Sequence, residues 1–138
     1  MTRRSKTVLF ILAVLVVLAY AGMVAFSIQD DRRAAAFRFA AEEPRAVLEK
    51  ITQSAKDKGG FTGSGVGLTI PDGAWPSLGP TRWTVTADGT VRGTAPERGL
   101  VVLLAPEMRD GKVAWKCSVE PARDFMPGTC GMIVRAYR

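Results

Sequence analysis

Twenty-two consecutive residues, Thr7–Ile28, carry no charge, and this run constrains the chain more than any other feature. As a helix it would be about 33 Å long, which is enough to cross a hydrocarbon core of about 30 Å. Residues 1–6 include three basic side chains, and basic residues before an apolar span stay on the cytoplasmic side. We therefore expect a transmembrane helix over residues 7–28, with residues 29–138 on the outer side of the membrane.

A cleaved signal peptide is the alternative interpretation of the same run. Ala19-Tyr20-Ala21 matches the small-residue pattern of a cleavage site, so processing after Ala21 would remove the apolar segment. The apolar residues continue to Ile28, however, which favours a retained anchor. Both interpretations place Cys117 and Cys130 in an oxidising compartment, where we expect them to form a disulfide rather than a redox-active pair.

The composition argues against several classes of function. The chain has no histidine and only two cysteines, which excludes a Ser-His-Asp triad, a Cys-His dyad, a His-ligated metal and an all-thiolate zinc site. Its net charge of +6 overstates its basic character, because three of the basic residues precede the apolar run. We expect no enzymatic activity, no cofactor or metal and no small-molecule substrate, and the charge does not indicate a nucleic-acid partner.

An amphipathic helix is predicted over residues 30–58. Its apolar positions recur at steps of three and four residues. These are Phe37, Ala40, Ala41, Pro44, Leu48, Ile51 and Ala55. Pro44 predicts a kink at Glu43, and Gly59-Gly60 predicts the helix end. No Gly or Pro lies between Ile28 and Ala34, so the span and this helix are expected to form one long helical segment that covers a sheet with its outer half.

Beyond Gly60 the pattern changes from helix to strand. Alternating or continuous apolar runs predict a four-stranded antiparallel meander over residues 82–87, 90–95, 100–105 and 112–119. Asp88-Gly89 and Asp110-Gly111 are typical hairpin turns. Val66–Ile70 is a candidate for a further short strand, and the alternation in residues 131–138 predicts a fifth, edge strand. The fold class is therefore α+β.

The C-terminal third resembles the type IV pilins. The matching segments are Gly111-Lys112-Val113-Ala114-Trp115-Lys116-Cys117 and Phe125-Met126-Pro127-Gly128-Thr129-Cys130. In that family a Gly-x-Val-x-Trp-x-Cys strand is followed by a loop and an aromatic-apolar-Pro-x-x-Cys closure. The resemblance implies a bacterial pilin-like domain with a long N-terminal helix and a disulfide-bounded loop at the edge of the sheet.

The N-terminal region departs from that family. Pilins carry a leader that ends in Gly, followed by Phe-Thr-Leu-x-Glu, and neither the Gly nor the Glu is found around the apolar run of this chain. The family uses the Gly for leader cleavage and the Glu for subunit register during assembly. We therefore expect an atypical subunit or an accessory protein that stays in the membrane or enters a filament sparsely.

Other conspicuous residues are expected to be structural. Trp75 is interpreted as a loop anchor, and Trp83 and Trp115 as core or cross-strand residues. Gly63-x-Gly65-x-Gly67 lacks the context of a phosphate-binding loop. Asp30-Asp31 and Glu42-Glu43 are interpreted as solvated surface.

The favoured function is that of a non-enzymatic pilin-like protein of the inner membrane. Its expected partners are membrane lipid and pilin subunits or pilus assembly proteins, which it would contact through small residues of the span. Candidates for this packing are Ala21, Gly22 and Ala25, together with Ala13. The alternative is a membrane-tethered or secreted binding module that uses the disulfide loop to contact a surface, DNA or a phage.

Overall fold

The computed structural model describes residues 3–137, which fall into two compact units that meet in the sequence between Asp31 and Arg32. Helix α1 (Arg3–Ala41) begins in the first unit and ends in the second, and helix α2 (Arg45–Lys58) follows after a short turn. No interruption occurs between Ile28 and Ala34, as predicted. The two helices include a helical stretch of 54 residues, Ser5–Lys58, which is interrupted only by the turn at residues 42–44.

The break between the helices has a local cause at Pro44. Proline has no N–H to donate into the preceding turn and disfavours the helical conformation of the residue before it. Helix α2 starts from this point, because the carbonyl of Pro44 accepts a hydrogen bond of 2.9 Å from the N–H of Leu48. The helix ends at Gly59, whose φ of 72° is left-handed and whose N–H donates to the carbonyl of Ala55. Both predicted boundaries are confirmed.

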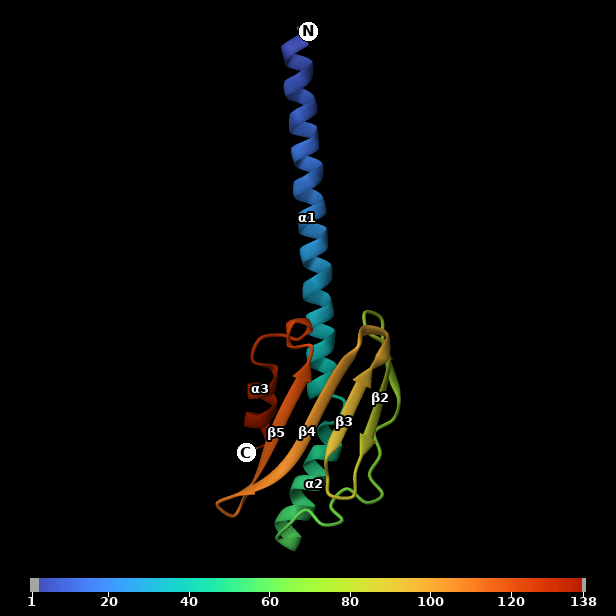
Figure 1. Cartoon of the computed structure of the whole chain (residues 1–138), viewed down its shortest axis with the longest axis vertical. Coiled ribbons are helices and arrows are strands. Elements are labelled where there is room, and N and C mark those ends of the chain that lie inside the picture. The colour runs from blue at the N-terminus through green and yellow to red at the C-terminus, as the bar shows by residue number, and fades with distance from the viewer. Residues whose placement is uncertain (1–2, 138) are drawn as a thin grey trace. The chain divides into compact units, whose positions relative to one another are not determined.

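A five-stranded antiparallel sheet forms the other layer of the second unit, with strand order β1-β2-β3-β4-β5 (Figure 1). The strands are β1 (Gly73–Trp75), β2 (Gly79–Val85), β3 (Val91–Ala95), β4 (Leu100–Arg109) and β5 (Lys112–Glu120). Strands β2 to β5 are the four predicted strands with shifted ends, so the predicted meander and α+β class are confirmed. In the β4–β5 hairpin both turn residues, Asp110 and Gly111, have positive φ, which matches the twist of the flanking strands.

Two strand predictions are wrong. The segment that follows Gly128 is helix α3 (Thr129–Ala136) and not an edge strand. Thr129 and Ile133 are buried, and Tyr137 is partly buried against the same core. These residues are spaced four apart, which is the period of a helix and not that of a strand. The fifth strand of the sheet is instead β1, which lies at the opposite edge, in a Pro-rich stretch where no strand was predicted.

Val66–Ile70 is not a strand either. Gly63 and Gly67 have positive φ, which breaks an extended conformation. Gly65 lies against the β2–β3 loop, where its N–H donates to the carbonyl of Ala87 and a Cβ would lie 1.9 Å from the carbonyl oxygen of Thr86. Gly65 therefore permits close packing of two loops, whereas Gly63 and Gly67 provide the positive φ of the turns beside it.

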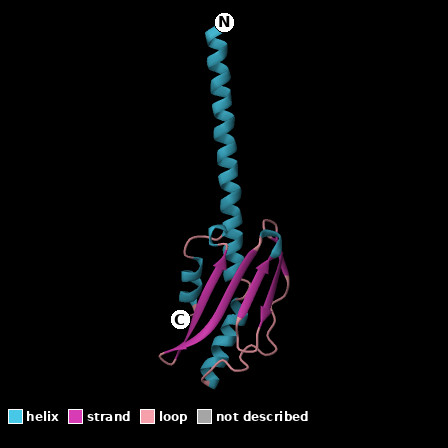
Figure 2. Cartoon of the chain, viewed as in Figure 1, coloured by secondary structure: helices cyan, strands magenta, loops and turns pink. Residues whose placement is uncertain are grey.

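The core lies between one face of the sheet and the helices of the second unit. Figures 1 and 2 show α2 behind the sheet and α3 beside β5. In the strands, buried residues alternate with more exposed ones, so the buried side chains lie on one face of the sheet. There they pack against the buried side chains of the helices. The largest fully buried members include Phe39, Leu48, Ile51, Leu100, Leu104 and Phe125. Phe39 packs on Trp83 with ring centroids 5.0 Å apart.

Candidate functional site

The surface of the N-terminal helix is the most unusual surface of the described chain. Every residue from Lys6 to Arg32 is exposed, and large apolar side chains such as Phe10, at 70%, face outward. Soluble monomers rarely expose contiguous apolar surface on this scale, because hydration of apolar groups is unfavourable. The helix is long and apolar enough to cross a membrane, and its position near the N-terminus also suits a signal sequence.

The residues predicted for helix packing lie within this exposed segment. Ala21 and Ala25 are four residues apart on one face of α1, and Gly22 lies beside them. A Cβ placed on Gly22 meets no atom within 4 Å. The small residues thus leave a shallow surface on which another helix can approach closely. No contact in the described chain tests this role, which stays a prediction.

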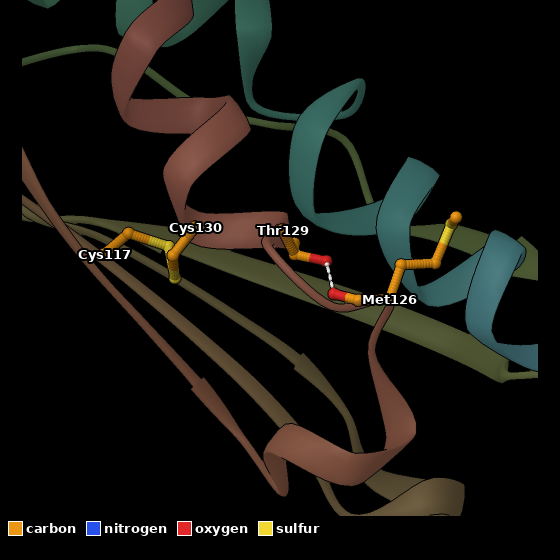
Figure 3. The surroundings of a disulfide bond; sticks show 4 residues. All are labelled: Cys117, Met126, Thr129 and Cys130. Carbon is orange, nitrogen blue, oxygen red and sulfur yellow. Dashed lines mark hydrogen bonds between the residues drawn. A yellow bond between two sulfur atoms is a disulfide. The ribbon is translucent and has the colours of Figure 1, made fainter.

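The predicted disulfide between Cys117 and Cys130 is confirmed, with a Cα–Cα distance of 5.3 Å. It joins β5 to the first turn of α3 and closes the segment between them (Figure 3). Within this segment the hydroxyl of Thr129 donates to the carbonyl of Met126 at 2.6 Å, and Phe125 is buried. The bond therefore closes an ordered segment whose inner residues belong to the core.

The outer side of the disulfide-bounded segment is solvent-exposed. Residues 126–128 are exposed, and the Met126 side chain points away from the disulfide. The guanidinium of Arg33 donates from Nε to the carbonyl of Arg123 at 3.2 Å, which ties the short 3₁₀ helix of this segment (Ala122–Asp124) to α1. The segment thus presents a small exposed loop held at both ends.

Glu43 forms a partly buried polar cluster that the sequence analysis did not identify. One carboxylate oxygen accepts a hydrogen bond from the indole N–H of Trp75 and the other from that of Trp83, each at 2.5 Å. The hydroxyl of Thr81 lies 3.3 Å from both oxygens. Because Pro44 interrupts the helix, the turn directs this carboxylate at the sheet. Trp75 was predicted to anchor a loop, but it is the last residue of strand β1, and its indole links this strand to Glu43. The assignment of Glu43 to solvated surface was wrong.

A signal for this cluster does exist in the sequence. Buried indole N–H groups need acceptors, and Glu43 is an acidic residue placed at the one predicted helix break. The sequence alone does not say that the break faces β1 and β2. That information lies in contacts between residues more than 30 positions apart.

Three groups outside the apolar segment have shifted pKa values. The Thr86 hydroxyl and then the Thr90 N–H lower the pKa of Asp88 in the β2–β3 loop by hydrogen bonding to the carboxylate. The Lys116 ammonium, assisted by Arg109, lowers the pKa of Glu107. Burial raises the pKa of Tyr137, and the charge of Glu49 adds to this effect. The first two shifts arise in a loop and in a cross-strand ion pair, and the third arises from packing at the end of α3.

No cluster of three or more His, Cys, Asp or Glu side chains suited to a metal ion occurs among residues 3–137. No family model, curated protein or solved structure matches this chain. What the structure shows is therefore an architecture: a long apolar N-terminal helix, an antiparallel sheet that packs on helices, and a C-terminal disulfide, an arrangement similar to that of pilins.

Proposed function

We propose that this chain is a non-enzymatic, pilin-like protein anchored in the bacterial inner membrane, where it acts as an atypical minor subunit or accessory of a type IV pilus-type assembly. The observation that carries the proposal is the combination of an exposed apolar helical segment with a disulfide-closed antiparallel domain on one chain. The resemblance of residues 111–130 to the C-terminal part of pilins supports it.

The apolar helix would do two things in this function. It anchors the chain, since a helix of this length in hydrocarbon satisfies all of its backbone hydrogen bonds internally. It also provides the surface for partners, because helices in lipid associate through close packing of small residues rather than through apolar burial. Ala21, Gly22 and Ala25 are the proposed contact surface.

The lack of a carboxylate in the apolar run distinguishes this chain from a typical filament subunit. A charged group inside a span is unfavourable and is kept where it has a function. Without it, the proposed protein has no charge to set its register against a neighbour. It would associate with pilins laterally and remain mostly in the membrane.

Photo-crosslinking in cells that make type IV pili tests the proposal. A photoreactive residue at Val24, next to the proposed contact surface, should capture pilin subunits or assembly proteins. Gly22→Leu should reduce the captured product by roughly tenfold, because a large side chain separates the helices. Ser27→Leu is the matched control, since it makes a similar change on the opposite face of the helix.

Two results would contradict the proposal. One is the recovery of no pilin or assembly component from piliated cells. The other is an equal effect of Gly22→Leu and Ser27→Leu on crosslinking and piliation. Either result favours the alternative of a free-standing binding module, whose exposed contact surface is the loop around Met126.

A further inference from the structure

The sheet of the second unit has one face packed on helices and one open face. The helices lie behind or beside the sheet in Figures 1 and 2, and none of those within residues 3–137 covers the face toward the viewer. A sheet covered on one side normally presents polar residues on its other side. Strand β4 departs from this pattern, because its outward positions are Val101, Leu103 and Ala105, and Leu103 is 39% exposed. A continuous apolar run is typical of a strand that is buried on both faces, so the outer side of β4 has the composition of an interface.

Charged side chains flank this apolar column. We call the outward side of strands β2 to β5 the open face, and its charged residues are Arg82, Arg92, Glu107, Lys116 and Glu120. Lys116 already pairs with Glu107 at 3.0 Å. Arg92 and Glu120 form no ion pair within the described part of the chain, and Arg82 reaches only an exposed carboxylate outside these strands, at 4.0 Å. Such a surface pair is weak, so two arginines and one carboxylate of the open face are free to bind a partner.

The strand register places the opposite charges at the two ends of one row. Arg82 pairs with Thr94, Thr94 with Val101, and Val101 with Glu120. The row therefore crosses all four strands, with Arg82 on β2 and Glu120 on β5. Three strand spacings separate these two residues by about 14 Å, so they do not pair within one copy of the chain.

A second copy of the chain satisfies both charges at once. When two open faces meet, a two-fold axis along the strands, between β3 and β4, exchanges β2 with β5 and β3 with β4. Arg82 then lies opposite Glu120 of the partner subunit, and Glu120 lies opposite Arg82 of the partner subunit. In the next row the axis places Leu103 opposite Arg92 of the partner subunit, whose aliphatic stem can cover it. The face is thus complementary to itself, as an isologous interface requires.

We propose that this chain forms a homodimer in which the open face packs on the open face of a second copy. The apolar column of β4 lies in the centre, and two Arg82–Glu120 pairs lie at the rims. Two sheets pack in this way about 10 Å apart, with their strands within about 30° of each other. Since the four strands span only about 14 Å, the buried area is small and the dimer should be weak and reversible.

The symmetry also suits a chain anchored at its N-terminus. An axis along the strands keeps both copies the same way up, so Arg32, where the chain enters the second unit, lies at the same end in both. Two copies in one membrane require this orientation. Only this point rests on the proposed function, and the dimer itself goes beyond it.

Sedimentation equilibrium of the full chain in detergent tests the dimer. The wild type should show a reversible equilibrium between monomer and dimer. Leu103→Lys should weaken dimerisation at least about tenfold, because it places an ammonium opposite the guanidinium of Arg92 of the partner subunit. Met132→Lys is the matched control, since Met132 is also 39% exposed but lies on α3, and it should leave dimerisation unchanged.

Exchange of the rim charges tests the register. Arg82→Glu and Glu120→Arg should each weaken dimerisation at least about tenfold, because like charges then face each other. The double variant should recover the wild-type dimer. An equimolar mixture of the two single variants should form heterodimers, which co-purify when one variant carries an affinity tag, because both facing pairs then have opposite signs. Contact between copies explains this recovery, since the two residues lie on different outer strands of one copy.

Three results would overturn the proposal. The first is a wild type that stays monomeric at all concentrations measured. The second is a dimer that Leu103→Lys and Met132→Lys weaken equally or that neither weakens, which would place the contact outside the open face. The third is a failure of both the double variant and the mixed single variants to recover dimerisation. None of these results bears on the capture of pilins by the span, so the two proposals fail independently.

Discussion

At the scale of single residues, Glu43 holds the helix turn to the sheet. Its carboxylate accepts hydrogen bonds from two indoles and lies close to one hydroxyl, and Gly73 leaves room for it, because a Cβ at that position would lie 3.0 Å from the carboxylate. Hydrogen bonds to a charged acceptor are stronger than neutral ones, with a net value of about 1.5–3 kcal/mol each. One side chain therefore connects α1, α2, β1 and β2.

Replacement of Glu43 by alanine should lower the free energy of unfolding by about 3 kcal/mol, because it leaves the N–H groups of Trp75 and Trp83 without an acceptor. Urea denaturation in detergent, followed by indole fluorescence, measures this change. Glu42→Ala is the control, since Glu42 is exposed and such substitutions change stability by less than about 0.5 kcal/mol. Equal effects of the two substitutions would show that the Glu43 hydrogen bonds contribute nothing.

Gly93 is required by the indole that lies across it. A Cβ at this position would lie 2.6 Å from two ring atoms of Trp83. Gly93→Ala should therefore displace the indole and destabilise the fold by about 1–3 kcal/mol, with a changed near-UV circular dichroism spectrum. Gly60→Ala, at a position with open space, should have little effect. An unchanged spectrum in the Gly93 variant would contradict this expectation.

Asp88 makes the β2–β3 loop sensitive to acid. Hydrogen bonds from Thr86 and Thr90 lower its pKa in the folded state below the ordinary value of 3.8. The ionised carboxylate thus contributes stability above about pH 3.8, and this contribution is lost as the pH falls through the folded-state pKa. The protection of the loop amides from hydrogen exchange, taken relative to the intrinsic exchange rate at each pH, should fall in this acid range for the wild type. Asp88→Asn should remove that dependence, and a retained dependence would refute the assignment.

At the scale of elements, the disulfide holds α3 against the sheet. This helix has only eight residues, and short helices depend on tertiary contacts for their stability. The Cys117–Cys130 bond fixes its first turn to β5, across a sequence separation of 13 residues. The position of α3 beside the sheet is therefore tied to an oxidising environment.

Replacement of both cysteines by serine should lower the free energy of unfolding by about 3 kcal/mol, the value expected for a closed loop of this length. Hydrogen exchange should increase first in α3, while β2 and β3 keep their protection. Chemical reduction of the wild type should reproduce both effects. Unchanged exchange in α3 after reduction would mean that the packing of Ile133 alone holds this helix.

At the scale of the whole molecule, processing of the N-terminus decides between an anchored and a released protein. If the span is retained, the intact mass of the membrane-extracted protein corresponds to a chain that starts before the apolar run. Ala19→Leu with Ala21→Leu, which removes the small-residue pattern, should then change the mass only by the substitutions themselves. A wild-type N-terminus at Gly22 that the double variant abolishes would identify a signal peptide instead.

Much of this architecture follows from local patterns in the sequence. The apolar run, the helix break at Pro44, the helix end at Gly59, the Asp110-Gly111 turn and the four strands β2 to β5 all depend on interactions between near neighbours. The Asp88-Gly89 pair also lies in a hairpin connection, but this connection is a longer loop of residues 86–90. Backbone geometry, side-chain periodicity and the hydrophobic effect act on such segments in the same way in most contexts. The disulfide also followed from the sequence, because two cysteines outside the membrane leave one pairing.

Only the tertiary structure decided the features that depend on distant contacts. The alternation in residues 131–138 predicts a strand, yet residues 129–136 form a helix, because the bond to Cys117 and the burial of Ile133 select the helical period. Strand β1 exists through its pairing with β2, and Glu43 is a cluster centre rather than a surface charge because two tryptophans reach it from the sheet. In each case the local conformational preference stabilises the chain less than the burial and hydrogen bonding that long-range packing provides.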